Sequence, residues 1–290
     1  MNGVARSPAA REAPGPAHRP ASRPAAPRPE APPPLASRYE PMHLGAFTDE
    51  ELRRFLAPLG LEPAEVAAGG EAWRRAAPAL AWELLYRVEP DLYVRLTAGE
   101  RLHPGILAWL PERIGTAVEV GAGWGRLTLD LAPRCRRLVA VEPAGPMRGF
   151  LGSNLAGHAS VEVVPGFFDD LPVASAAADL VIACSSFTAD PAHGGDTGLA
   201  EMERVCSPGG LVVVVWPDQP EWLVDRGFAA VAFEGDMAVE YASAEEAAEL
   251  ARIFWPDAAD EVERRGDRRV PYEVLGVPAP RSLCWRRRAA

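Results

Sequence analysis

The feature that most constrains the fold of this chain is a short apolar run that leads directly into three closely spaced glycines. It extends from Thr116 to Leu127 and reads TAVEVGAGWGRL. This pattern predicts a buried strand, a glycine-rich turn and the first turn of a helix. Such a turn lets the backbone approach a ligand at the carboxyl edge of a sheet, and the helix presents free N–H groups to it. We therefore predict a ligand-binding loop at Gly121, Gly123 and Gly125.

The segments around this loop alternate between strand and helix patterns, which predicts a parallel sheet. Apolar runs predict strands over 117–120, 137–141, 160–164, 179–184 and 211–216, with a further candidate over 228–233. Helical patterns cover 125–132, 146–155, 198–205 and 243–254. Val270–Leu275 and Ser282–Arg286 are expected to pair as a terminal antiparallel element. The predicted fold is α/β and Rossmann-like, with a mostly parallel seven-stranded sheet that carries helices on both faces.

The residues before the sheet fall into two parts. Residues 1–37 are rich in Pro, Ala and Arg, and a segment of this kind buries too little apolar surface to fold, so it is predicted to be a disordered tail. Residues 38–112 are predicted to be a helical N-terminal cap, with helices from Thr48, over 70–87, 92–96 and 104–110. The cap should pack beside the sheet or over its ligand edge. Residues 113–290 are assigned to the Rossmann-like domain.

Aromatic residues of the cap allow two interpretations. Trp73, Trp82, Tyr86 and Tyr93 suit core packing. Alternatively, Tyr86, Tyr93 or His103 closes over the ligand.

Composition excludes several classes of function. The net charge of −10 argues against nonspecific nucleic-acid binding, although Arg281, Arg286, Arg287 and Arg288 cluster near the C-terminus. The four cysteines show no ligand spacing, so neither a disulfide framework nor a metal site is expected. No apolar run is long enough for a membrane span or a secretory signal. We expect a cytoplasmic protein without a membrane or nucleic-acid partner.

The ligand of the glycine loop is narrowed by the residues around it. Glu142 ends the second predicted strand, where a carboxylate can accept both hydroxyls of a ribose. A dinucleotide site would place a third glycine at the position of Arg126, so an NAD-type oxidoreductase is disfavoured. The chain has no Lys, which excludes a P-loop nucleotidase. A nucleoside-containing ligand other than a dinucleotide is favoured.

Five ordered motifs carry a resemblance to a known family. Glu119–Gly125 (EVGAGWG) resembles the first motif of class I S-adenosylmethionine-dependent methyltransferases, and the type 11 group in particular. The later motifs are Val141–Pro143 (VEP), Asp170–Pro172 (DLP), Ala178–Val181 (ADLV) and Glu203–Gly210 (ERVCSPGG). The resemblance covers roughly 104–216 and implies S-adenosyl-L-methionine as the cofactor and methyl transfer (EC 2.1.1.-) as the reaction.

The resemblance also implies roles for individual residues. Those around the methionine part of the cofactor would be Glu119, Gly121, Ala122, Gly123 and Gly125. Glu142 would bind the ribose with Pro143 beside it, and Cys184 and Ser185 would lie under the donor sulfur. The alternative for Glu119 is an acid that only orders its own loop.

The adenine end departs from the family pattern. The family carries an acidic residue four places before the Leu-Pro step, where this chain has Phe167. Phe167 and Phe168 could pack on the adenine, Asp169 could take over the contact to its amino group, or adenine affinity is lower here.

Residues near the end of the fourth and fifth predicted strands are candidates for binding the methyl acceptor. His193, in the loop after the fourth strand, is the candidate general base, and the alternative is an exposed loop histidine. Trp216, Trp222 and Phe187 either line an apolar acceptor pocket or belong to the core. A small-molecule methyl acceptor is the expected partner. A noncatalytic protein that keeps the fold is the alternative.

Overall fold

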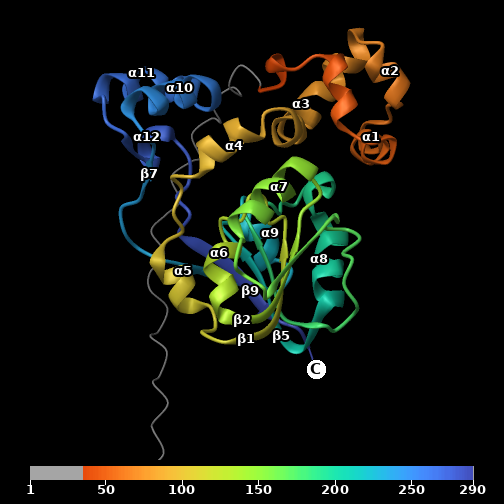
Figure 1. The fold of residues 1–290 in the computed structure, drawn as a ribbon, viewed down its shortest axis with the longest axis vertical. Helices are drawn as coiled ribbons and strands as arrows, with labels where there is room; N and C mark the ends of the chain where they lie inside the picture. The colour runs from red at the N-terminus through yellow and green to blue at the C-terminus, as the bar shows by residue number, and fades with distance from the viewer. Residues whose placement is uncertain (1–34, 290) are drawn as a thin grey trace, which may run out of the picture. The chain divides into compact units, whose positions relative to one another are not determined.

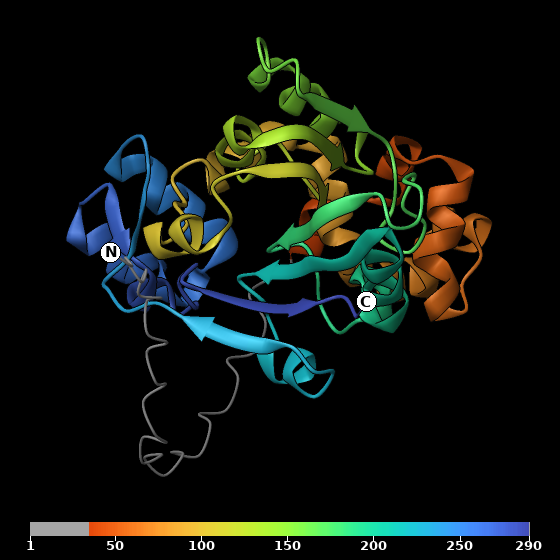
Figure 2. The same cartoon turned by 90° about the horizontal axis from the view of Figure 1, so that it is seen from below.

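A seven-stranded sheet forms the centre of the computed structural model, which describes residues 35–289. The strand order is β3-β2-β1-β4-β5-β9-β6, and Figure 2 shows β9 and β6 at one edge. The strands are β1 (Ile114–Val120), β2 (Cys135–Val141), β3 (Val161–Val164), β4 (Ala178–Cys184), β5 (Cys206–Val215), β6 (Ala229–Ala232) and β9 (Ser282–Arg287). The predicted tail lies outside the described residues except for its last three, which join the 3-10 turn η1 (Leu35–Arg38).

Strand pairing confirms the mostly parallel sheet. β1 to β5 run parallel to one another, and β9 runs antiparallel to both β5 and β6. The fifth strand begins at Cys206 rather than at 211, and its pairing with β4 carries an irregularity at Ala178 and Leu180.

The expected pairing of Val270–Leu275 with the last strand is wrong. Arg269–Pro271 forms β8, which pairs with β7 (Ala238–Glu240), and Tyr272–Leu275 forms the helix α12. Pro271 lacks the N–H that a longer strand would need. The apolar side chains of this segment are buried away from the main sheet, which leaves β9 to pair with β5 and β6.

Helices cover both faces of the sheet, as the sequence predicts. Alternate residues of β1 and β2 point to opposite faces. On one face they pack against α5 (Pro104–Trp109), α6 (Thr128–Leu131) and α7 (Gly145–Asn154). On the other face the sheet packs against α8 (Gly195–Val205), and α9 (Pro220–Val224) joins the same buried cluster beside β6 and β9. The 3-10 turn η4 (Ala132–Arg134) follows α6, and η5 (Pro191–His193) precedes α8.

A cap built from two segments of the chain adjoins the sheet (Figure 1). The N-terminal segment contains η2 (Pro41–Ala46), α1 (Asp49–Leu56), η3 (Ala57–Leu59), α2 (Pro63–Ala67), α3 (Gly70–Val88) and α4 (Pro90–Thr97). The C-terminal segment contains β7, α10 (Ala244–Phe254), α11 (Pro256–Arg265), β8 and α12. Leu80 and Leu84 of α3 share one buried cluster with Leu250 and Tyr272 of the C-terminal segment. Residues 238–275, which the sequence assigned to the sheet domain, therefore pack with the N-terminal helices.

The arginines near the C-terminus bind other parts of this chain. Arg286 pairs with Glu203 and donates to the carbonyl of Arg226, while Arg287 and Arg288 donate to the carbonyls of Gly209 and Cys206. These contacts fasten the edge of the sheet. Among residues 35–289, no helix has the length and apolar character that crossing a membrane requires.

Candidate active site

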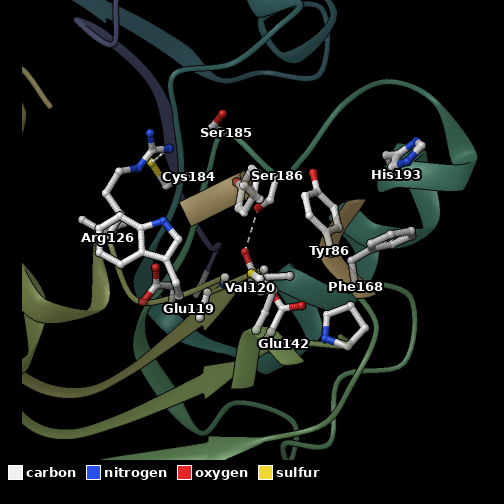
Figure 3. Close-up of a pocket in the computed structure, with 18 of the residues that line it drawn as sticks. Tyr86, Glu119, Val120, Arg126, Glu142, Phe168, Cys184, Ser185, Ser186 and His193 are labelled. Carbon is white, nitrogen blue, oxygen red and sulfur yellow. Dashed lines mark hydrogen bonds between the residues drawn. The ribbon is translucent and has the colours of Figure 1, made fainter. Parts of the chain in front are cut away.

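A cavity opens at the carboxyl ends of β1, β2 and β4, beneath α3 and α4; we call it the strand-end cavity (Figure 3). Most of the residues predicted to bind a ligand line it. They are Glu119, Gly121, Ala122, Gly123, Glu142, Pro143, Phe168, Cys184, Ser185 and His193. Segments distant in sequence thus meet where the parallel strands end, as the topology requires.

The three loop glycines adopt backbone conformations that favour glycine. Their φ angles are +73° at Gly121, +57° at Gly123 and +106° at Gly125. A Cβ on Gly121 would lie 2.5 Å from Oγ of Ser186, and one on Gly125 would lie 2.8 Å from Cδ1 of Leu151. A Cβ on Gly123 would meet no atom within 4 Å. Gly121 and Gly123 line the cavity, whereas Gly125 does not and instead permits close packing against α7.

Glu142 connects the end of β2 to the glycine loop. Its carboxylate accepts hydrogen bonds from the backbone N–H of Gly123 at 2.9 Å and of Ala144 at 2.8 Å. Burial raises the pKa of Glu142 to about 7, because it disfavours the charged form more than these bonds favour it. The loop and the acid that the sequence predicts to act together are therefore in direct contact.

Glu119, on β1, is almost fully buried at 1% exposure and accepts a hydrogen bond from the hydroxyl of Thr128 at 2.7 Å. Burial raises its pKa to about 8. The same residue lines the cavity. The two interpretations of Glu119 are compatible, since it orders the helix start while facing the cavity.

Arg126, at the position where a dinucleotide site would carry a glycine, lines the strand-end cavity. Its guanidinium forms an ion pair with Glu100, lies 5.4 Å from the ring centroid of Trp216, and approaches Sγ of Cys184 at 3.7 Å. Figure 3 shows it beside Cys184 at one end of the cavity. Burial raises the pKa of Cys184 to about 11, so this side chain is a neutral thiol at neutral pH.

Phe167 and Asp169 do not line the strand-end cavity. Asp169 forms an ion pair with Arg54 of α1, and the Arg54 guanidinium lies 4.3 Å from the Phe167 ring centroid. Phe167 also contacts Phe55 edge-on, with ring centroids 6.0 Å apart. Both side chains attach their loop to the cap, because α1 offers an aromatic and a cationic partner. The structure therefore does not support the predicted contact between Asp169 and an adenine amino group, and of this segment only Gly166 and Phe168 reach the cavity.

A second cavity, which we call the aromatic cavity, adjoins the first and has a volume of about 360 Å³. Five of its lining residues are aromatic: Trp82, Tyr86, Tyr93, Trp216 and Trp255. The residues that line both cavities are Tyr86, Tyr93, Ser185, Ser186 and His193. Two residues that line the aromatic cavity have strained backbones. Ser185 directly follows β4 and Trp216 directly follows β5, with φ of +58° and +51°.

The other predicted acceptor residues are placed differently. Phe187 is buried in the core beside α8, and Trp222 lies on α9 beneath the Arg226 guanidinium. His103 stacks on Phe233 with ring centroids 5.4 Å apart. These three residues line neither cavity. Of Trp216, Trp222 and Phe187, which the sequence suggested for an acceptor pocket, only Trp216 lines a cavity.

Some lining residues were not predicted from the sequence. Glu83, Met147 and Ser186 line the strand-end cavity. Ser186 donates a hydrogen bond to the carbonyl of Val120 at 2.9 Å and so joins the ends of β4 and β1. Glu83 sits between apolar residues of α3 and pairs with the buried Arg87. The sequence could have indicated Glu83, because it is an acidic residue on the apolar face of a predicted helix.

The charged groups of the strand-end cavity are mostly acidic. Glu83, Glu119 and Glu142 line it together with one guanidinium, that of Arg126. Burial raises the pKa of Glu119 to about 8 and that of Glu142 to about 7, and Glu83 pairs with Arg87, so these carboxyls act mainly as hydrogen-bonding groups. Because Arg126 pairs with Glu100, the cavity offers no free cation to a diphosphate. No group of three or more His, Cys, Asp or Glu residues suited to a metal occurs within 35–289.

Part of the sheet domain is similar to known proteins. Residues 117–210 match the family model described as a methyltransferase domain. This match covers less than half of the chain, and it agrees with the resemblance of the sheet topology and the motif order to class I S-adenosylmethionine-dependent methyltransferases.

Particular relatives share part of this chain. An uncharacterized methyltransferase of Mycobacterium tuberculosis is 30% identical over 129 residues, which cover 43% of this chain and 50% of that protein. One from Geobacillus kaustophilus is 29% identical over 109 residues, which cover 37% of this chain and 50% of that protein. The chain thus spans about half the length of these curated relatives. Among solved structures, YcgJ of Bacillus subtilis aligns with a TM-score of 0.43 and 12% identity over 70% of this chain and 99% of that one.

Proposed function

We propose that this protein transfers the methyl group of S-adenosyl-L-methionine to a small-molecule acceptor. The observation that carries the proposal is the contact between the glycine loop and Glu142 at the edge of the strand-end cavity. The four cysteines are free and buried, which suits the reducing cytoplasmic location that forms part of the proposal.

The residues present fit this cofactor. Glu142 keeps lone pairs for the ribose hydroxyls beside the two N–H groups it already accepts. The space next to Gly123 that a Cβ would enter is free of protein atoms. Gly121, Gly123 and Glu119 would hold the methionine part, and Pro143 and Phe168 would contact the adenine. When bound, the cofactor supplies an electrophilic methyl group on a positively charged sulfur.

The charge of the cavity supports this cofactor over NAD. S-adenosylmethionine carries two positive groups, a sulfonium and an ammonium, and one negative carboxylate, so its net charge is positive. The ionised form of Glu142 would attract it, whereas the diphosphate of a dinucleotide would find no free cation in the cavity, because Arg126 pairs with Glu100.

The protein's part in the reaction would be alignment of the acceptor. Methyl transfer is an in-line displacement, and most of its acceleration comes from holding the acceptor atom opposite the leaving sulfur. The aromatic cavity meets the strand-end cavity at Ser185, Ser186 and His193, and this boundary is where the two substrates would meet. His193 would take the proton from an acceptor hydroxyl or amine.

Calorimetric titration tests the cofactor. We expect S-adenosylhomocysteine to bind and NAD to bind at least a hundredfold more weakly, whereas a preference for NAD would overturn the proposal. His193→Ala then tests the base: turnover of an identified acceptor should fall by about 10²-fold or more. Unchanged turnover would remove His193 from this role.

A further inference from the structure

We propose that the aromatic cavity binds an uncharged, flat aromatic acceptor, one that presents a phenolic hydroxyl or a neutral ring nitrogen to the boundary with the strand-end cavity. This inference rests on the proposed function, because it names the substrate class of the same reaction. Three properties of the cavity carry it: the continuity of its aromatic wall, the absence of a free charge in its lining, and the polar groups at its inner end.

The aromatic wall is continuous across three helices of the cap, α3, α4 and α10. Phe254 stacks on Trp82 with ring centroids 6.0 Å apart, and Trp82 lies 6.2 Å from Tyr86. Tyr86 in turn meets Tyr93 edge-on at 4.7 Å. Trp82 remains 44% exposed although it is a large apolar side chain. A row of neighbouring rings with one exposed member provides a surface on which a flat ring system can stack.

The lining of the aromatic cavity offers no charge for an ionic acceptor to bind. Glu100 is its one carboxylate, and that carboxylate is taken by the ion pair with Arg126. Arg126 itself lies under Trp216 and Cys184 rather than in the aromatic cavity. A charged acceptor would therefore lose its hydration without gaining a free partner.

The polar side chains of the aromatic cavity that are left for an acceptor lie at the end that adjoins the strand-end cavity. The other two, Thr97 and Glu100, already bind Trp124 and Arg126. Ser185, Ser186, Thr188 and His193 come from the loop that follows β4, whereas Trp82, Leu96, Trp255 and Val277 come from the cap side. An acceptor whose ring stacks on the cap would thus direct a hydroxyl or nitrogen toward the cofactor. The cavity volume of about 360 Å³ suits an acceptor of two or three fused rings.

Three probes with one ring system and different charge test the inference. They are 2-naphthol, 2-naphthoate and 2-naphthylmethylamine, which are neutral, negative and positive at pH 7. Each is titrated against the full chain saturated with S-adenosylhomocysteine. We expect 2-naphthol to bind at least tenfold more tightly than either ion, because the ions find no free counter-charge. Tighter binding of the amine would overturn the inference in favour of a cationic acceptor. Tighter binding of the naphthoate, or no binding of any probe, would also overturn it.

A pair of matched variants locates the probe. Trp82→Leu should weaken 2-naphthol at least fivefold while leaving the affinity for S-adenosylhomocysteine unchanged. Trp222→Leu, a tryptophan that lines neither cavity, should change neither affinity. Equal effects of the two variants would overturn the placement. If 2-naphthol binds but S-adenosylhomocysteine does not, the proposed function is contradicted while the aromatic binding site is supported. If S-adenosylhomocysteine binds but 2-naphthol does not, only this inference is contradicted.

Discussion

Replacement of Glu142 by Gln perturbs the contact on which the cofactor site depends. The carboxylate accepts two backbone N–H groups, from Gly123 and Ala144, at 2.9 and 2.8 Å. A glutamine offers only one acceptor oxygen, so its NH2 group would face one of these donors. One ribose hydroxyl would also lose its charged acceptor.

The expected loss of affinity follows from these contacts. A hydrogen bond to a charged group contributes about 1.5–3 kcal/mol. The loss of one such bond to the ribose, together with a disturbed N–H in the loop, should cost about 3 kcal/mol of binding free energy. This corresponds to a rise of roughly a hundredfold in the dissociation constant of S-adenosylhomocysteine.

The assay is calorimetric titration of wild type and Glu142→Gln, with thermal unfolding to show that both are folded. Glu162→Gln is the matched control, since Glu162 lies on the neighbouring β3 with its side chain 54% exposed and paired with Arg137. The control should bind like wild type. A dissociation constant for Glu142→Gln within threefold of wild type would refute the role of this acid.

Three further predictions concern the loop, the cap and the pH dependence. Gly125→Ala should destabilise the protein by about 1–3 kcal/mol, because φ is +106° and a Cβ would press on Leu151. Gly149→Ala, inside α7 with open space around its Cβ, should instead stabilise by about 0.5–1 kcal/mol. Equal unfolding midpoints of the two variants would contradict this. Asp169→Asn should leave the affinity for S-adenosylhomocysteine within threefold of wild type and lower stability by about 0.5–1 kcal/mol, because Asp169 pairs with Arg54 rather than lining the cavity. A large loss of affinity for S-adenosylhomocysteine would show that Asp169 contributes to the cofactor site. Burial raises the pKa of Glu142 to about 7 in the free protein, and the ribose should favour the ionised form. S-adenosylhomocysteine affinity should therefore fall by up to tenfold per pH unit below pH 7, and a flat profile from pH 6 to 8 would show that Glu142 does not titrate on binding.

The sheet and its ligand edge were predictable because their patterns are local. A buried parallel strand is a continuous apolar run, and Gly121, Gly123 and Gly125 sit where positive φ angles are needed. The position of Glu142 followed from the same rule, since parallel strands end at one edge.

The second cavity depends on contacts that no local pattern records. Residues 238–275 return to the N-terminal helices, so Trp255 and Val277 reach a cavity that also contains Trp82 and Glu100. The partners of Phe167 and Asp169 were missed for the same reason, because Arg54 and Phe55 are more than a hundred residues away in the sequence. The sequence predicted a helix after Thr48, but not which loop packs against it.

A crystal structure of the protein soaked with S-adenosylhomocysteine tests the central claim most directly. The account predicts the ribose on Glu142, the methionine part along Gly121 and Gly123, and the sulfur facing the aromatic cavity past Ser185 and Ser186. A nucleoside bound elsewhere, or a sulfur closed off from the aromatic cavity by protein, would contradict the proposed methyl transfer.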